Sequence, residues 1–132
     1  MSRLTTAAML LLAAGTAHAQ QTPPAAHVTP LMTKALADYP GKEGVMITVE
    51  YPPGGESQVH QHNAHAFVYV LEGSIVMGVR GGKTVTLTPG QTFYEGPDDI
   101  HTVSRNASVT NPAKFLVVLM KNSGEPISKP VH

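Results

Sequence analysis

Residues 54–73 read GGESQVHQHNAHAFVYVLEG, in which a glycine turn, a pair of histidines and an extended apolar segment follow one another. His60 and His62 are two positions apart, and side chains of an extended strand alternate between its two faces. Both imidazoles are therefore expected on one face. A third imidazole on a later strand, His101, can complete a set of nitrogen ligands around one divalent metal. The sequence thus predicts a metal site at these three histidines.

The chain around this stretch consists of short runs of β-branched, aromatic and alternating apolar residues, each ended by a turn signal. Gly81-Gly82, for example, suits a hairpin turn that needs positive φ. The pattern predicts strands over residues 45–51, 67–71, 75–79, 85–87, 92–95, 100–104 and 115–120. Residues 31–37 are expected to form one or two helical turns, because Tyr39-Pro40-Gly41 would end them. The fold class is accordingly all-β, an antiparallel sandwich or barrel.

The N-terminus has the pattern of a secretory signal peptide over residues 1–19. Arg3 supplies the positive charge, Leu4 to Ala14 is apolar, and Ala17-His18-Ala19 is a cleavage site. The apolar run is too short for a helix that crosses a bilayer, which needs roughly twenty residues. We therefore expect a periplasmic or secreted protein. Because the chain has no cysteine, we expect neither a lipoprotein nor disulfides.

The charge balance argues against two classes of partner. The chain has nine basic and nine acidic residues, and loss of Arg3 with the signal peptide leaves a formal charge of −1. There is no basic stripe and no tryptophan, so nucleic acid is not expected as a partner. No basic amphipathic helix is visible either, and we expect no membrane partner after cleavage.

Two segments of the chain resemble the conserved motifs of small single-domain cupins of the type-2 barrel family. The first is Gly54-(five residues)-His60-Gln61-His62-(three residues)-Ala66-(six residues)-Gly73, and the second is PGQTFYEGPDDIH at residues 89–101. The resemblance implies a cupin β-barrel, a double-stranded β-helix or jelly roll, over residues 45–122. Residues 20–44 would then be an N-terminal arm and 123–132 a C-terminal tail. The family analogy also implies a homodimer, in which the arm covers a sheet edge.

The chain departs from the first cupin motif at one position that bears on metal chemistry. The family usually places a glutamate where this chain has Ala66. Three neutral imidazoles would leave a bound divalent ion with its full double charge, whereas a carboxylate ligand would cancel one unit. The expected site therefore favours anionic substrates that chelate the metal. The resemblance implies iron or manganese, with nickel, copper or zinc as alternatives, since nitrogen ligands suit all five.

Three further residues are candidates near the histidines. His65 is a possible fourth ligand, but if position 66 faces the interior, position 65 faces outward unless the strand bulges. Glu95 is a candidate acid/base group in the pocket, with an exposed strand carboxylate as the alternative. Gln58 could share the face of His60 and contribute a ligand.

Two functions from different classes remain open at this point. The first is a metal-dependent, dioxygenase-like enzyme that acts on a small chelating substrate at a three-histidine site. Cupin enzymes that cleave carbon–carbon bonds of diketones or oxygenate thiols use such sites, so the resemblance permits that class. The second is a non-catalytic periplasmic protein that binds a metal or a small ligand. Catalysis by a metal needs open coordination positions and a dry, shaped cavity.

Overall fold

The computed structural model describes residues 21–132, and the expected signal peptide, residues 1–19, lies outside the described residues. The described part is built from ten strands. They are β1 (His27–Ala35), β2 (Lys42–Tyr51), β3 (His60–Gln61), β4 (Ala64–Glu72), β5 (Ile75–Val79), β6 (Val85–Leu87), β7 (Thr92–Glu95), β8 (Ile100–Asn106), β9 (Ala113–Asn122) and β10 (Lys129–Pro130).

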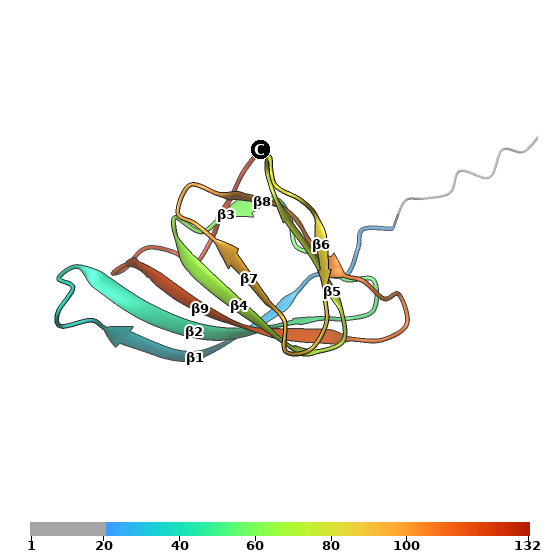
Figure 1. Ribbon diagram of the computed structural model, residues 1–132, viewed down its shortest axis with the longest axis horizontal. Helices are drawn as coiled ribbons and strands as arrows, with labels where there is room; N and C mark the ends of the chain where they lie inside the picture. Colours follow the sequence, from blue (N-terminus) through green and yellow to red (C-terminus); the bar gives the residue numbers. More distant parts are fainter. Residues whose placement is uncertain (1–20) are drawn as a thin grey trace, which may run out of the picture.

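The strands form two five-stranded sheets with the orders β1-β2-β9-β4-β7 and β10-β3-β8-β5-β6 (Figure 1). All the strand pairs within them are antiparallel. The first sheet carries most of the core, on β2, β4 and β9, and the second sheet adds Ile75, Met77 and Leu87. The predicted antiparallel jelly-roll barrel is therefore confirmed.

The core lies between the inner faces of the two sheets, because apolar side chains alternate along the long strands. On β4, Ala66, Val68 and Val70 are buried, while Phe67 and Tyr69 between them are exposed. β2 and β9 repeat this alternation. The alternation fixes the register, since a slip by one residue would move every apolar side chain to the solvent.

Gly73 shows why the first motif ends in glycine. It follows β4 with a positive φ of 67°, a conformation in which a side chain is strained. An added Cβ would lie 2.5 Å from the carbonyl oxygen of Pro112, so the turn also has no room for one. This turn leads the chain from β4 in one sheet to β5 in the other.

The structure differs from the sequence-based expectation at the N-terminal side of the barrel. The helical turns predicted over residues 31–37 are wrong, since His27–Ala35 is strand β1, paired with β2. Tertiary pairing along β2 outweighs the weak local preference for a helix. Within residues 21–132 there is no helix long and apolar enough to cross a membrane.

Candidate metal centre

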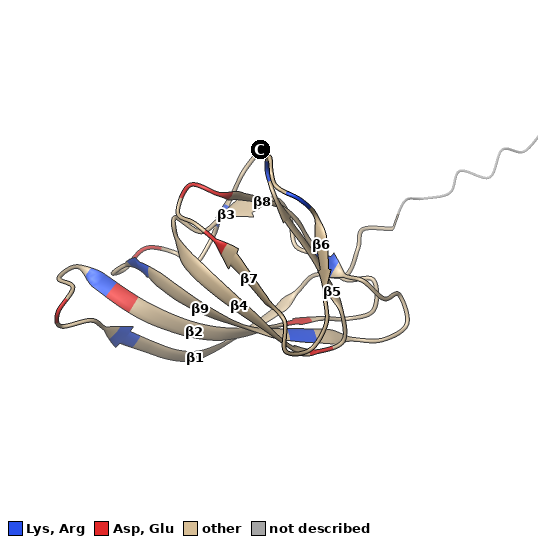
Figure 2. Ribbon diagram, in the orientation of Figure 1, with Lys and Arg blue, Asp and Glu red and all other residues tan. Residues whose placement is uncertain are grey.

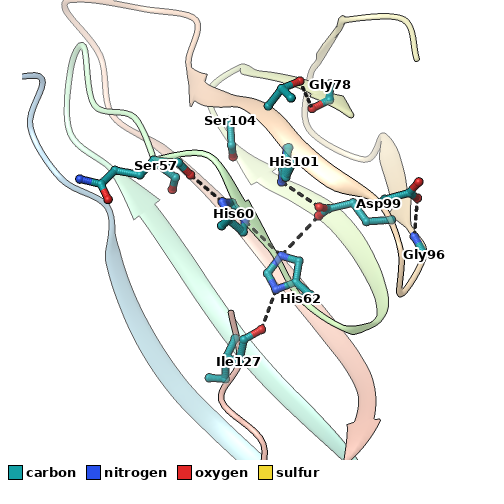
Figure 3. Close-up of polar contacts among 12 residues, drawn as sticks. Ser57, His60, His62, Gly78, Gly96, Asp99, His101, Ser104 and Ile127 are labelled. Carbon is teal, nitrogen blue, oxygen red and sulfur yellow. Dashed lines mark hydrogen bonds and ion pairs between the residues drawn. The ribbon is translucent and has the colours of Figure 1, made fainter. Parts of the chain in front are cut away.

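Three histidines meet where β3 pairs with β8. His60 on β3 lies directly opposite His101 on β8 in the register of the pair. His62 follows β3, and the next residue, Asn63, turns the chain toward β4 with a φ of 50°, a left-handed conformation that asparagine tolerates. Figure 3 shows the three imidazoles close together. The ring centroid of His60 lies 4.8 Å from that of His62 and 4.9 Å from that of His101.

Backbone carbonyl groups fix the tautomers of the first two histidines. Nδ1 of His60 lies 2.7 Å from the carbonyl oxygen of Gln58, and Nδ1 of His62 lies 2.7 Å from that of Ile127. A carbonyl oxygen only accepts, so each Nδ1 carries the proton and donates it. Each neutral ring then has a lone pair on Nε2, and the two Nε2 atoms face each other at 3.2 Å. Two lone pairs at this distance repel unless a cation lies between them, which is the arrangement of metal-binding imidazoles.

Glu95 supplies a carboxylate to the same cluster. It ends β7 and is 2% exposed, so the alternative of an exposed strand carboxylate is wrong. Its Oε1 lies 2.9 Å from Nδ1 of His101 and its Oε2 lies 3.6 Å from Nε2 of His62. In the β4–β7 register Glu95 is the direct partner of Ala66, the position where the first motif usually has its glutamate. The carboxylate therefore enters from the neighbouring strand.

This placement corrects the expectation of a site without a carboxylate. The group that could hold a metal ion is His60, His62, Glu95 and His101, whose ligand atoms all lie within 4.8 Å of one another. A divalent ion held by three neutral imidazoles and one carboxylate carries a net single positive charge rather than a double one. The site then still attracts an anion, but it is best balanced by a single negative charge.

The donor set fits a transition metal on two observations. Both ring nitrogens of His101 and Oε1 of Glu95 are buried without an assigned hydrogen-bond partner among the described residues, although Nδ1 of His101 lies only 2.9 Å from Oε1. Buried polar atoms are rarely left unpaired, and a metal bound to one ring nitrogen of His101 and to the carboxylate of Glu95 would satisfy two of these three atoms. Moreover, two ligands at about 2.1 Å from one ion lie roughly 3.0 to 3.4 Å apart. The separations of 2.9 and 3.2 Å match the short edges of such a polyhedron.

The electrostatics of the cluster keep its carboxylate ionised. Burial alone raises the pKa of Glu95, but the imidazoles of His101 and His62 outweigh it and lower the pKa to about 2. Burial lowers the pKa of His60, and this favours its neutral form, which binds metals. Burial also lowers the pKa of His62, but the carboxylate of Glu95 outweighs that effect and the net pKa is raised. The cluster is thus a negative site that attracts cations.

The four residues line a cavity of about 410 Å³ between the two sheets. This is the size of a small-molecule site. Its walls are mainly apolar and come from the inner faces of β2, β4 and β9. Ring stacking also holds His101 in place, because Phe93 lies against it with centroids 6.0 Å apart and an angle of 22°. A small ligand in this cavity reaches the metal cluster within an apolar surrounding.

The other two candidates, His65 and Gln58, are not members of the cluster of four. His65 lies on the opposite face of β4 from Ala66, is exposed, and its Nδ1 is 2.6 Å from the hydroxyl oxygen of Tyr94. It is not among the four residues that the structure brings together. Gln58 lines the cavity, and its carbonyl oxygen, rather than its side chain, serves the site by accepting from His60.

Comparison with known proteins gives a consistent assignment of the fold. A family model described as the cupin domain matches residues 47–119. A cupin domain from Bordetella pertussis has 23% identity and a TM-score of 0.61, with 77% of this chain and 99% of that chain covered. An oxalate oxidase in complex with the substrate analogue glycolate has 27% identity and a TM-score of 0.62, with 83% of this chain and 57% of that chain covered.

A DMSP lyase from Ruegeria pomeroyi has 22% identity and a TM-score of 0.58, with 67% of this chain covered. The present chain covers 43% of that lyase, so it spans less than half of the enzyme's length. No sequence among the curated proteins matches this chain. At these identities the neighbours from Bordetella and Ruegeria support the fold alone.

Proposed function

The chain belongs to the cupin domain family, and from this premise we propose that it is a metal-dependent, dioxygenase-like oxidoreductase that acts on a small chelating anion. His60, His62, Glu95 and His101 would hold one divalent metal, with iron or manganese favoured and nickel, copper or zinc as alternatives. The bound metal would supply Lewis acidity and, for iron or manganese, redox chemistry. The substrate would occupy the adjoining cavity of about 410 Å³.

One observation carries this proposal. The Nε2 lone pairs of His60 and His62 converge at 3.2 Å because backbone carbonyl groups hold both Nδ1 protons on the far side of the rings. The orphaned atoms of Glu95 and His101 complete the set. The oxalate oxidase in complex with the substrate analogue glycolate supports a small hydroxy-carboxylate monoanion as the kind of molecule to test first.

The enzymatic proposal is tested by oxygen uptake. The purified protein, loaded separately with iron and with manganese, is supplied with small carboxylates, diketones, flavonols and thiols. We expect metal-dependent oxygen consumption with at least one of these classes, and its loss in Glu95→Ala and His101→Ala. Oxygen uptake that persists in both variants would contradict the proposal.

A binding protein is the second candidate, and one observation favours it. Among the described residues that line the cavity, the acidic groups are Glu95, which belongs to the metal cluster, and Glu56, which is exposed. The cavity thus lacks a separate buried general base. If loaded protein binds small anions and consumes no oxygen with any of the four substrate classes, a periplasmic metal- or ligand-binding role is the better account.

The pH dependence of metal binding follows from the histidines. An imidazole must lose its proton to bind a metal, so affinity is expected to fall as pH drops through about 6.5. The raised pKa of His62 makes the fall begin above that value, while the lowered pKa of His60 makes this ring protonate later. Glu95, with a pKa of about 2, stays ionised throughout. Dissociation constants from competition with a chelator between about pH 5 and 8 would show this; a flat profile would contradict it.

We also propose that the protein is a homodimer. Every residue of β1 is exposed, including Leu31 (52%) and Met32 (58%), and Phe67, Tyr69 and Tyr94 are about half exposed on the same sheet. Figure 2 shows few charges in the middle of these strands. An edge strand with unpaired backbone groups and exposed apolar side chains tends to pair with another chain unless something covers it. Light scattering at micromolar concentration should give a dimer mass that Met32→Lys lowers; a monomer mass for the wild-type chain would contradict the proposal.

Export remains a proposal that rests on the sequence of residues 1–19. After expression with the full leader, the periplasmic fraction should contain a chain that begins at Gln20, which intact mass spectrometry detects. Recovery only of the full-length mass, from the cytoplasm, would contradict export.

A further inference from the structure

A second polar group lines the same cavity as the metal cluster. The hydroxyl oxygen of Tyr51 lies 2.6 Å from Oγ of Ser57 and 2.7 Å from Oγ of Ser104, and all three residues line the cavity. Tyr51 is 1% exposed and Ser104 is 6% exposed. We call these three residues the hydroxyl cluster. None of them belongs to the group that could hold a metal.

The hydroxyl cluster and the metal cluster lie on the same two segments, β8 and the residues that lead into β3, and are separated along them. Ser104 lies three residues beyond His101 on β8, and the backbone N–H of Ser57, three residues before His60, donates to the carbonyl oxygen of Ser104 at 2.9 Å. Three residues of strand span about 10 Å. An irregularity in the β5–β8 register, at which Thr102 has no partner, lets His101 and Ser104 both be buried despite their odd spacing.

Counting hydrogens shows that the hydroxyl cluster has a donor to spare. Three hydroxyl groups carry three hydrogens, and two hydrogen bonds join them. One O–H is therefore left, and no acceptor for it is found among the described residues. Burial raises the pKa of Tyr51 above its usual value, so the phenol keeps its proton and the hydroxyl cluster stays neutral. The hydroxyl cluster is thus a neutral group that lines the cavity and has one O–H more than its internal hydrogen bonds use.

The charges around the cavity decide which acceptor group of a ligand this donor can bind. Among its described lining residues there is no lysine or arginine, and Glu56 stands beside Ser57 at the rim. Val49, Phe115 and Val117 are among the apolar residues that line the same cavity as the two polar groups. A second carboxylate on the ligand would be buried without a positive partner, which is costly. A ketone, ester, ether or amide oxygen accepts the spare hydrogen without that cost.

We propose that the ligand is a small monoanion that chelates the metal at one end and carries a neutral hydrogen-bond acceptor at the other, which the hydroxyl cluster of Tyr51, Ser57 and Ser104 binds across an apolar spacer. This inference deepens the proposed function and rests on it. The anionic end matches the single positive charge that a divalent ion keeps beside Glu95.

The test uses hydroxamates as chelating probes on the zinc-loaded protein, with affinity measured by calorimetry. Three spacer lengths are each made with an acetyl, an isosteric isopropyl or a carboxylate end, and acetohydroxamate serves as the chelating end alone. The matched variant is Tyr51→Phe/Ser57→Ala/Ser104→Ala, which removes all three hydroxyl groups and keeps the rest of each side chain. Because no member of the hydrogen-bonded set is left without its partner, the cost to folding is expected to be small, which circular dichroism and thermal unfolding check.

We expect the ratio of acetyl-probe to isopropyl-probe affinity to be greatest at one spacer length in the wild-type protein. In the variant this ratio should fall about tenfold, the worth of one buried hydrogen bond to a neutral group. The carboxylate-ended probes should bind more weakly than the acetyl-ended ones. A ratio that is the same at all three spacer lengths in the wild-type protein overturns the inference without any variant, and so does tightest binding by a carboxylate end.

Acetohydroxamate distinguishes a failure of the hydroxyl cluster from a failure of the metal site. It should bind the wild-type protein and the variant equally, because it reaches only the metal. If it binds both while the acetyl-to-isopropyl ratio is unchanged in the variant, the hydroxyl cluster has no role and the metal site stands. If it does not bind zinc-loaded wild-type protein, the proposed metal site fails and the inference fails with it.

Discussion

Replacing Glu95 by alanine is expected to lower the affinity for a divalent metal at least about a hundredfold, since even groups behind the ligands contribute ten- to a hundredfold. The change removes the carboxylate of the cluster and leaves His101 without its 2.9 Å neighbour. Glu95→Gln should lose nearly as much, because it keeps the shape of the side chain but not its charge. Metal content after dialysis, together with competition against a chelator, measures both variants.

Restoring the carboxylate on the opposite strand should rescue binding. Ala66 is fully buried and is the direct register partner of Glu95. Partners in an antiparallel pair are about 5 Å apart, so a glutamate at position 66 reaches the same cluster. We expect Ala66→Glu/Glu95→Ala to regain at least about tenfold over Glu95→Ala. Wild-type metal content in the single variant, or no gain in the double variant, would contradict the role of Glu95.

Replacing His101 by alanine is the second change with a large expected effect. His101 is 3% exposed, both of its ring nitrogens lack a hydrogen-bond partner, and it lies opposite His60. We expect metal content to fall to near background, as it should in His60→Ala and His62→Ala. The apolar core does not depend on these side chains, so the variants should still fold, which circular dichroism checks.

His65→Ala is the matched control for these three variants. It removes an imidazole from the same segment, but one that lies on the outer face of β4 beside Tyr94. Metal stoichiometry should stay near that of the wild-type protein. If His65→Ala loses metal as completely as His101→Ala does, the strand bulges in solution and the assignment of inner and outer faces is wrong.

Much of the barrel could be predicted from the sequence, because alternation of apolar residues is a local signal. The predicted bounds of β5 (Ile75–Val79) and β7 (Thr92–Glu95) agree with the structure. β1 could not be predicted in this way, since all of its residues are exposed and no burial pattern marks it. Its conformation comes from pairing with β2, which is not a local property.

The candidate site was predictable only in part, for a similar reason. The spacing of His60 and His62 and the second motif with His101 indicated the imidazoles. The place of Glu95 in the cluster depends on the register between β4 and β7, which sets it opposite Ala66. A single sequence carries no signal for that register. The same holds for the hydroxyl cluster, since an irregularity in β8 brings Ser104 to the inner face with His101.

The most direct measurement of the metal centre is anomalous diffraction at the absorption edge of the metal, from crystals of manganese- or zinc-loaded protein. We expect a single strong peak per chain, bounded by Nε2 of His60 and His62, the carboxylate of Glu95 and the imidazole of His101. A metal-loaded crystal with no peak among these four side chains, or with its peak at His65, would contradict the account.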